Sequence, residues 1–525
     1  FDQIGAYGFT LSRPDILDRN EAGARSWGAG VFMWIGGIRA AVAERVMEAA
    51  GKKGGPVAAA LLTGLRGNIP KSDLSAIRDA GLAHLLAISG LHMALMSGAA
   101  FWIVRFLIAS IPWLALRVVG KKWAAGVGIF TGLVYFLLAG GSVATERAFI
   151  MVAVALVAVL VDRPAISLRN VALAALIVLL MRPENLVEAG FQMSFAAVVA
   201  LTAFYERVKY PGRGDTGNIS GARSTNPGSM IVKILLGTVL TTLIASLATG
   251  PLAAFNFNRV AVFGLAANVL AVPLVGFAVM PLGLLALILM PFGLDGPALA
   301  LMGMGTAALV DISRTVSGWP GAAILVPSPP AMVIPVLVSG GLWLCLWRRN
   351  WRFWGLVPMG LAFWLAAQNQ TPDIYVDEQG RRIAIKTTGG QLILSKDRGA
   401  RYAASQWLRR MADPRDVKTA TSAGGDSDAL TCDPRGCIAD FVDTDGRNYR
   451  LAYIRHPAAI AEECRQADIV IARIPLFDRC VGPAIVIDRF DLSRSGASTI
   501  SFGPPGPQVT TVMAEIGWRP WARNP

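Results

Sequence analysis

Residues 81–107, GLAHLLAISGLHMALMSGAAFWIVRFL, constrain the fold of this chain more than any other stretch. The segment is apolar and long enough to cross a bilayer, which takes about 20 residues. Its first half nevertheless contains His84 and His92, with Ser89 and Gly90 between them. Ionisable side chains in a membrane segment usually face a protein interior or a water-filled cavity. The segment therefore predicts a helix bundle with a polar site inside it, and the Ser-Gly pair predicts a kink or local unwinding.

The composition indicates the same class of protein. Hydrophobic residues make up 54% of the chain and charged residues 16%, and the mean hydropathy is +0.50. We expect a polytopic α-helical membrane protein with about ten spans, together with interfacial or re-entrant helices. The interfacial helix is expected at 28–50. The candidate spans are 84–108, 123–140, 148–161, 170–181, 187–205, 231–252, 259–277, 279–292, 297–317, 331–347 and 353–368.

Lysine and arginine in short loops predict the orientation of the helices. The basic links 117–122, 162–169, 206–233 and 348–352 are all expected on the cytoplasmic side. Five candidate spans separate the last two links, and an odd number does not fit this arrangement. One of them is therefore expected to be re-entrant or interfacial: a member of the pair 259–277 and 279–292, or 297–317, whose exit looks interfacial.

This topology gathers the unusual polar residues in the outer half of the bundle, where a vestibule would receive substrate. The expected lining residues are His84, Ser89, Gly90, His92, Arg147, Gln192, Ser194, Asn256 and Arg259. Structural alternatives stay open. The histidines can donate to backbone carbonyls of neighbouring helices, and Arg147 can extend to the membrane interface. Two imidazoles without a nearby carboxylate or thiol do not predict a metal site, so no metal and no catalytic residue is expected.

Hydropathy falls sharply after Gln370, so residues 370–525 predict a soluble α/β or α+β domain on the outer side. Strands are expected at IYVD, RRIAIKT, QLILS, ADIVIA and PAIVIDR, helices at 399–411 and 457–466, and a polar loop at 413–431. The domain holds Cys432, Cys437, Cys464 and Cys480, which allow three disulfide connectivities in an oxidising compartment. The short loop favours Cys432–Cys437, and a four-thiolate zinc site is the lesser alternative.

Four stretches carry a family resemblance: AHLLAISGLHMAL, ERAFIM, RPENLVEAGFQMSF and FNFNRVAVFGLAANVLAVPL. In this order they resemble the ComEC-type competence proteins, the inner-membrane channels of bacterial DNA uptake. The resemblance implies a transmembrane channel domain at 28–369 that passes one DNA strand, independently of its sequence, into the cytoplasm. It favours a phosphate-contacting role for Arg147, and it implies a periplasmic DNA receptor and a cytoplasmic helicase or translocase as partners. It also makes residues 1–27 the tail of a truncated N-terminal domain and its connector.

The C-terminal domain departs from that family. Many relatives end in a metallo-β-lactamase-like nuclease with a His-x-His-x-Asp-His motif, whereas this domain has one histidine, His456. A two-metal nuclease needs several imidazole and carboxylate ligands, so we expect no nuclease of this type, no enzyme activity and no cofactor. The absence of a GxxxxGK[ST] motif also predicts no ATPase in this sequence.

Two other functions remain as hypotheses. The net charge of +14 suits a DNA backbone but also a small anionic solute, so a secondary transporter is the main alternative. An intramembrane hydrolase would use Ser89 with a histidine, but it needs an oriented base and the neighbouring spans offer no Asp.

Overall fold

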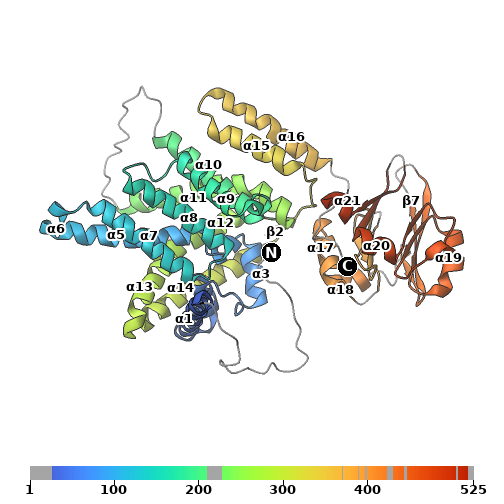
Figure 1. The fold of residues 1–525 in the computed structure, drawn as a ribbon, viewed down its shortest axis with the longest axis horizontal. Coiled ribbons are helices and arrows are strands. Elements are labelled where there is room, and N and C mark those ends of the chain that lie inside the picture. Colours follow the sequence, from blue (N-terminus) through green and yellow to red (C-terminus); the bar gives the residue numbers. More distant parts are fainter. Residues whose placement is uncertain are drawn as a thin grey trace. The chain divides into compact units, whose positions relative to one another are not determined.

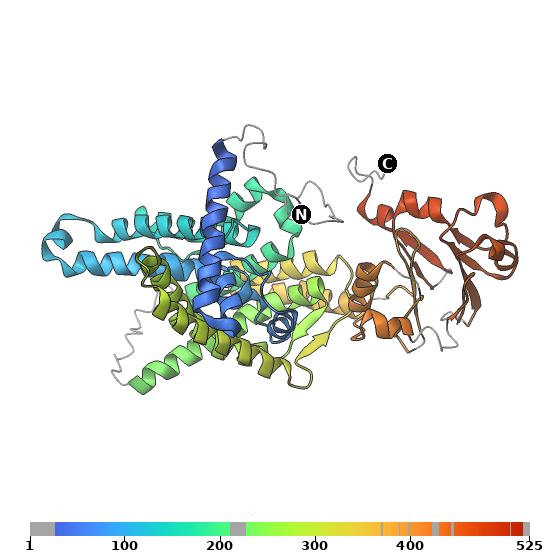
Figure 2. The ribbon, with the colours of Figure 1, turned by 90° about the horizontal axis from the view of Figure 1, so that it is seen from below.

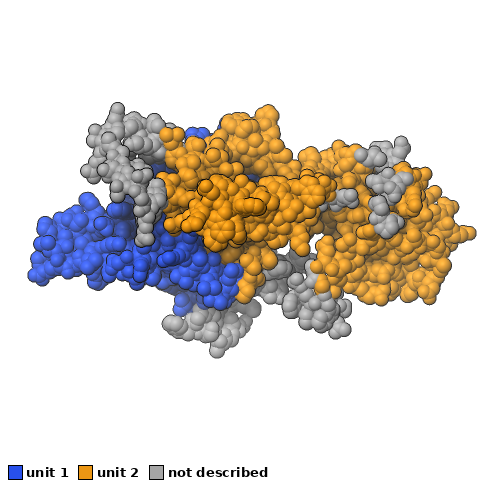
Figure 3. Space-filling model, turned by 90° about the horizontal axis from the view of Figure 1, so that it is seen from above, with its two compact units in different colours: residues 1–78, 82–182, 267–315 blue, residues 79–81, 183–266, 316–525 orange. Residues whose placement is uncertain are grey.

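The computed structural model describes residues 27–209, 227–368, 371–387, 389–396, 399–422, 430–442, 446–503 and 506–517 (Figure 1). The chain divides into two compact units, which Figure 3 colours separately. The first comprises residues 1–78, 82–182 and 267–315, and the second comprises residues 79–81, 183–266 and 316–525. Residues 1–26 of the expected tail and connector at 1–27, the central part of the 206–233 link and part of the 413–431 loop lie outside the described residues.

The first unit is helical. Its helices are α1 (Trp27–Ala49), α2 (Gly51–Thr63), α3 (Lys71–Asp79), α4 (Ala83–Leu86), α5 (Gly90–Ser110), α6 (Pro112–Arg117), α7 (Gly120–Leu138), α8 (Val143–Leu160), α9 (Leu168–Met181), α12 (Gly264–Leu274), α13 (Met280–Leu289) and α14 (Gly296–Ser317). Figure 2 shows α1 as one long helix, in agreement with the helix expected at 28–50. Its place along the interface stays a prediction.

Small residues let the helices of this unit pack closely. A Cβ added at Gly303 of α14 would lie 2.1 Å from the carbonyl oxygen of Ala50, and one added at Gly54 of α2 would lie 2.0 Å from the carbonyl oxygen of Gly303. The hydroxyl of Thr306 also donates to the Gly54 carbonyl, at 2.9 Å. Helices in a membrane associate mainly through such packing and hydrogen bonds, because lipid tails are as apolar as leucine.

Small residues also allow α5 and α7, which run side by side, to pack closely (Figure 1). A Cβ at Gly132 would lie 2.6 Å from the hydroxyl oxygen of Ser97, and one at Gly128 would lie 3.1 Å from the carbonyl oxygen of Ser97. The two glycines form a G-x-x-x-G pattern on the face of α7 that meets α5.

Residues 264–292 form one helical run, which corrects the two spans expected at 259–277 and 279–292. A π-helical turn at Val275–Val279 lies between Pro273 and Pro281 and joins α12 to α13 without a break. Such a turn accommodates the backbone groups that a proline leaves unpaired. Among the described residues, three helices long enough to span and the 14-residue helix Val333–Leu346 then lie between the basic links 206–233 and 348–352. The shared side expected for the two links stays a prediction.

Residues 259–261 form a strand rather than the beginning of a span. Strand β1 (Arg259–Ala261) pairs antiparallel with β2 (Ala323–Leu325), in the segment that was expected to be an interfacial exit. Asn258 precedes β1 at a φ of +54°, and its side-chain amide donates to the Val326 carbonyl at 3.1 Å. The turn therefore has partners for its backbone and side chain within the second unit.

Six helices in the described residues are long and apolar enough to cross a membrane, so the expected count of about ten spans is not confirmed. They are Gly90–Ser110, Gly120–Leu138, Val143–Leu160, Leu236–Phe257, Gly264–Phe292 and Gly296–Ser317. The helices expected near 170–181 and 331–347 are present as α9 and α15 but have 14 residues each. At 1.5 Å per residue they are about 21 Å long, which is less than the hydrocarbon core.

The second unit contains further helices and all the longer sheets. Its elements up to residue 367 are η1 (Pro183–Val187), α10 (Ala189–Lys209), α11 (Pro227–Phe257), β1, β2, α15 (Val333–Leu346), η4 (Asn350–Gly355) and α16 (Leu356–Ala367). The spans expected at 187–205 and 353–368 correspond to α10 and α16. These two helices are not among the six that are long and apolar enough to cross a membrane.

Residues 371–517 form two five-stranded sheets with helices, in agreement with the expected mixture of strands and helices. The sheet orders are β10-β9-β8-β7-β6 and β12-β11-β3-β4-β5. The strands are β3 (Ile374–Val376), β4 (Ile383–Lys386), β5 (Leu392–Leu394), β6 (Thr431–Cys432), β7 (Gly436–Val442), β8 (Asn448–Ile454), β9 (Ile469–Ala472), β10 (Ile485–Ile487), β11 (Ser498–Ser501) and β12 (Gln508–Thr511). The helices are α17 (Arg401–Arg410), α18 (Val417–Ser422), α19 (Ile460–Gln466), α20 (Arg489–Ser495) and α21 (Val512–Ile516). Helix α18 corrects the loop expected at 413–431.

Alternation along the strands builds three hydrophobic clusters. Ile383 and Ile385 of β4 point to a core shared with Leu451 and Tyr453 of β8, so the two sheets face each other. The intervening residues point the other way, where Ala384 packs with α17 and α18 and Ala452 packs with α19. Helices therefore cover the outer faces of both sheets.

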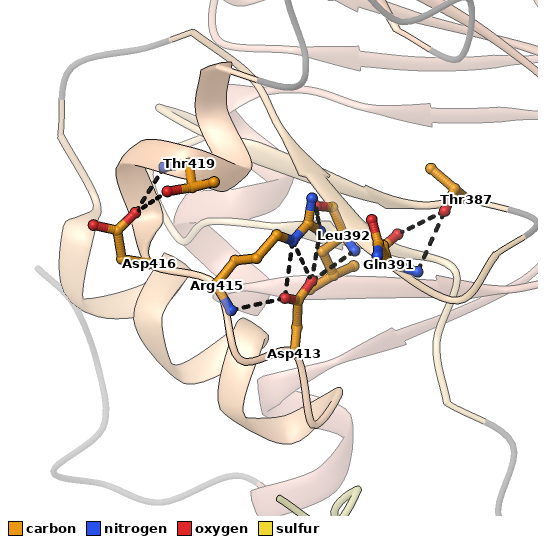
Figure 4. Close-up of polar contacts among 7 residues, drawn as sticks. All are labelled: Thr387, Gln391, Leu392, Asp413, Arg415, Asp416 and Thr419. Carbon is orange, nitrogen blue, oxygen red and sulfur yellow. Dashed lines mark hydrogen bonds and ion pairs between the residues drawn. The ribbon is translucent and has the colours of Figure 1, made fainter. Parts of the chain in front are cut away.

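Strand β5 is the edge of its sheet, and two side chains cover its outer backbone groups (Figure 4). The Leu392 N–H donates to the Asp413 carboxylate at 3.3 Å, and the Leu392 carbonyl accepts from the Arg415 guanidinium at 2.7 Å. Burial disfavours the charged Asp413 carboxyl, but the hydrogen bonds from Arg415 and Leu392 outweigh it and lower its pKa. This pairing protects the edge strand from pairing with other chains.

We expect the substitution Gly303→Ala to destabilise the protein by about 1–3 kcal/mol, because its methyl group would meet the backbone of Ala50, between α1 and α2. The thermal unfolding midpoint of the purified chain in detergent measures this. Gly126→Ala in α7 is the matched control, since a Cβ there meets nothing within 4 Å. Equal midpoints for the two variants would contradict the packing argument.

We expect Asp413→Asn to expose β5 to hydrogen exchange, with a loss of local stability of about 3 kcal/mol, because Arg415 would lose its buried partner. The wild-type contribution is fully present above the ordinary Asp pKa of about 3.9 and is lost as pH falls through the lower folded-state value. Hydrogen-exchange protection at 392–394 measured between pH 7 and pH 3 tests both statements. Protection in Asp413→Asn that matches the wild type at pH 7 would disprove the role of the pair.

Candidate functional site

The segment at 84–108 is two helices with a break between them, so the span begins at Gly90 and not at His84. Helix α4 ends at Leu86, and Ser89 has extended backbone angles (φ −103°, ψ 173°) as the N-cap of α5. The local unwinding expected from the Ser-Gly pair is therefore present. Such a break inside apolar sequence must satisfy its own backbone groups or line a cavity.

His92 closes the break from the third position of α5. Its Nδ1 accepts a hydrogen bond from the Ser89 N–H at 3.1 Å and lies 3.1 Å from the Ser89 hydroxyl oxygen. This is a capping box in which an imidazole takes the place of the usual Glu or Gln. The structural alternative considered from the sequence was donation to another helix, whereas here the ring accepts from its own helix start.

The geometry also assigns the tautomer of His92. Because Nδ1 accepts, the proton of the neutral ring is on Nε2. His92 is fully buried, and Nε2 has no hydrogen-bond partner among the described residues. A buried N–H donor without a partner is costly, so this atom is the clearest sign of a polar function in the segment. His84, in α4, is exposed.

Arg147 is the fifth residue of α8. Ser142 caps the helix by accepting from the Thr145 N–H at 3.4 Å. Arg147 is 5% exposed, so its side chain is inside the first unit and does not extend to a lipid interface. Its neighbour Glu146 pairs instead with Arg182, at 3.6 Å.

Gln192 and Ser194 lie in α10, one turn into the helix. The Gln192 amide donates to the Leu186 carbonyl at 3.1 Å, which ties the helix start to η1. Its Oε1 is buried and has no partner among the described residues, like Nε2 of His92. Ser194 is half-buried.

Asn256 and Arg259 have structural partners. The Asn256 amide donates to the Leu252 carbonyl within α11 at 2.9 Å, and Arg259 pairs with Asp79 at the end of α3. Asp79 was not singled out from the sequence, although it is an acid directly before the apolar segment 81–107. These contacts give the two residues a role in holding the local structure together.

The structure joins only some of the expected residues. Ser89 and His92 are in direct contact, and together with His84, Gly90 and Arg147 they belong to the first unit. The others belong to the second unit: Gln192, Ser194, Asn256 and Arg259. The expected lining residues thus fall in two separate units, and the common vestibule stays a prediction.

No group of three or more His, Cys, Asp or Glu residues in the described part of the chain could hold a metal ion. The structure pairs Cys432 with Cys437, which face each other in the β6–β7 hairpin, and Cys464 with Cys480. Cys345 in α15 is a free thiol.

Comparison with known proteins gives a family and several relatives. Residues 61–351 match the family described as competence protein. The chain is 28% identical over 225 residues to ComE operon protein 3 of Bacillus subtilis, 34% identical over 169 residues to competence protein ComA of Neisseria gonorrhoeae, and 28% identical over 227 residues to recombination protein 2 of Haemophilus influenzae. The matches cover 42%, 32% and 43% of this chain.

The same matches cover 25%, 23% and 27% of those relatives, so the chain matches only about a quarter of their length. No solved structure matches the chain. The family match contains the helix break, Arg147, and all the other residues expected to line the path.

We expect His92→Gln to retain the start of α5, because Gln at this position can also accept from the Ser89 N–H. His92→Ala loses the acceptor and should destabilise the helix start by about 1 kcal/mol. Hydrogen-exchange protection at 90–94 in the purified protein distinguishes them. If Gln and Ala behave alike, the imidazole does not act as a cap.

Proposed function

The chain belongs to the competence protein family, whose match spans residues 61–351, and on this premise we propose that it forms a channel for transforming DNA in the bacterial inner membrane. Its substrate is a single strand that crosses without sequence readout. Six apolar helices supply a membrane-spanning body for such a channel. A polyanion needs a polar path with a positive bias, and it needs little recognition of individual bases.

The observation that carries the proposal is the broken helix at 83–110. The positive end of the α5 dipole and the buried Nε2–H of His92 meet at the break, within otherwise apolar sequence. Helix N-termini bind phosphate groups through their exposed N–H donors and dipole. A neutral imidazole can donate a hydrogen bond to a phosphate without adding a positive charge. The contact is therefore weak enough for the substrate to leave again.

The proposed path is lined by residues with different strengths of support. His92, Ser89, Gly90 and Arg147 have the strongest, since the two charged or ionisable side chains are buried within one unit. Gln192 has a buried oxygen that no described residue satisfies. His84 and Ser194 complete the path, whereas the structural partners of Asn256 and Arg259 assign those two residues a supporting role at its margin.

The surroundings of the channel belong to the same proposal. A periplasmic receptor delivers DNA, and a cytoplasmic helicase or translocase supplies the energy. Residues 370–525 form a domain on the periplasmic side, where an oxidising environment maintains the two disulfides of the structure. The domain has no nuclease activity of the two-metal type, and the chain needs no cofactor.

The decisive experiment follows labelled DNA into the cytoplasm of a deletion strain. We expect the wild-type protein to restore nuclease-protected DNA and Arg147→Ala to leave it at the level of the deletion, because the strand would lose a buried guanidinium partner. His92→Glu should also fail, since a carboxylate can complete the capping box but has no N–H to donate. Arg163→Ala, at an exposed arginine between α8 and α9, is the control and should restore entry.

Equal entry with all variants at equal expression would contradict the site. Entry that does not depend on the protein at all would contradict the channel, and uptake of a small anion by vesicles would then identify the transporter alternative.

A further inference from the structure

A cluster of tryptophan and arginine side chains lies where α15 ends and η4 leads into α16, in the sequence WLCLWRRNWRFW at 343–354. The helices α15 and α16 form a hairpin (Figure 1). Gly340 and Gly355 allow its two arms to approach, since a Cβ on either would lie 2.5 Å from the other's carbonyl oxygen. The cluster is the turn of this hairpin.

Three indole rings of the cluster pack on one another. The ring centroids of Trp343, Trp347 and Trp351 are 4.4 to 5.5 Å apart. The Trp343 Nε1–H donates to the Trp351 carbonyl at 3.2 Å. Trp347 and Trp351 are nevertheless 40% and 43% exposed, so the packed rings also form a surface.

Cationic groups gather around these rings. The Arg207 guanidinium at the end of α10 donates to the carbonyls of Leu344 and Trp347 at 2.9 and 3.0 Å, which caps the C-terminal end of α15. Arg348 pairs with Glu206 at 3.1 Å. Burial, together with the charges of Arg352 and Arg348, lowers the pKa of Arg207, so these guanidinium groups lie close enough to repel one another.

Two further arginines increase the excess of positive charge. Arg352 lies over the Phe353 ring at 4.7 Å, and Arg349 lines the same hollow as Arg348. Among the described residues, Glu206 is the one carboxylate that forms an ion pair with this group. A hollow of about 1010 Å³ opens here, lined by Leu346, Trp347, Arg348, Arg349, Asn350 and Trp351.

We propose that this hollow binds the phosphodiester headgroup of an anionic phospholipid. Arg348 and Arg349 contact the phosphate, and the exposed faces of Trp347 and Trp351 lie at the level of the glycerol and the first acyl carbons. Basic hollows at the cytoplasmic ends of membrane helices bind such headgroups, and Trp is enriched at this depth. The positive-inside rule places the 348–352 link on that side.

The short helices favour a lipid over a nucleic acid. Helix α15 has 14 residues and α16 has 12, about 21 and 18 Å, against a hydrocarbon core of about 30 Å. Short apolar helices are accommodated by thinning of the bilayer and by interfacial Trp and Arg anchors. The planes of the three indoles are also inclined to one another by 49° to 77°, so they do not present a row of parallel faces on which successive bases could stack.

The test uses the full chain in detergent and phosphatidylglycerol as the probe, with phosphatidylcholine as the neutral reference. Native mass spectrometry and the unfolding midpoint both report binding. We expect the double variant Arg348→Gln with Arg349→Gln to weaken phosphatidylglycerol binding about tenfold or more, since each arginine near an anionic surface contributes about a factor of five. Phosphatidylcholine binding should not change.

The matched control is Arg163→Gln with Arg169→Gln, in another exposed basic link. Equal losses in both double variants would overturn the proposal in favour of general charge attraction. The variant Arg348→Lys with Arg349→Lys preserves the charge and guards against a folding defect, and it should retain most of the binding.

Competition by inorganic phosphate at millimolar concentration would identify a free-phosphate site, and displacement of the lipid by a thymidine oligonucleotide would identify a nucleic-acid surface. Either result overturns the lipid assignment.

Discussion

Backbone groups that leave a helix within apolar surroundings must find partners inside the protein, and this constraint explains three irregular places among the described residues. At 87–89 the Ser89 N–H is accepted by His92. At 275–279 a π-helical turn maintains the helix past two prolines. At 258–261 a two-stranded pairing takes over, supported by the side chain of Asn258. Each break is closed by different chemistry. At the first of them, a buried side-chain donor, the Nε2–H of His92, has no acceptor among the described residues.

That leftover donor distinguishes a structural break from a functional one. A histidine that acts only as a cap would be replaceable by Glu, which ordinarily completes this box. The imidazole differs from a carboxylate because it can accept at Nδ1 and donate at Nε2 at the same time. One ring therefore holds the helix start in place, and its Nε2–H has no acceptor among the described residues. Further along the same helix, Ser97 packs against Gly128 and Gly132 of α7.

Much of the membrane part was predictable from the sequence, because apolar runs with basic flanks delimit helices such as α7, α8 and α14 to within a few residues. The pair 259–277 and 279–292 was wrong because prolines normally end a helix, and the sequence does not reveal that a π-helical turn absorbs them. In the sheets, β7 and β8 went unpredicted because polar residues such as Asp440 and Arg450 interrupt their hydrophobic alternation. For the site, the Ser-Gly pair predicted the local unwinding, but the partner of Arg259 required the fold, since Asp79 is 180 residues away.

The lengths of the helices have a consequence for the surrounding membrane. Within the first unit, the run at 264–292 has 29 residues, about 43 Å, whereas α9 has 14 residues, about 21 Å. Neither length matches a hydrocarbon core of about 30 Å, and they differ from it in opposite directions. Where both helices lie in a bilayer, the long one tilts or projects into the water, and the lipid beside the short one thins. Two such helices side by side give a protein no single hydrophobic thickness, so the lipid around it would be of uneven depth.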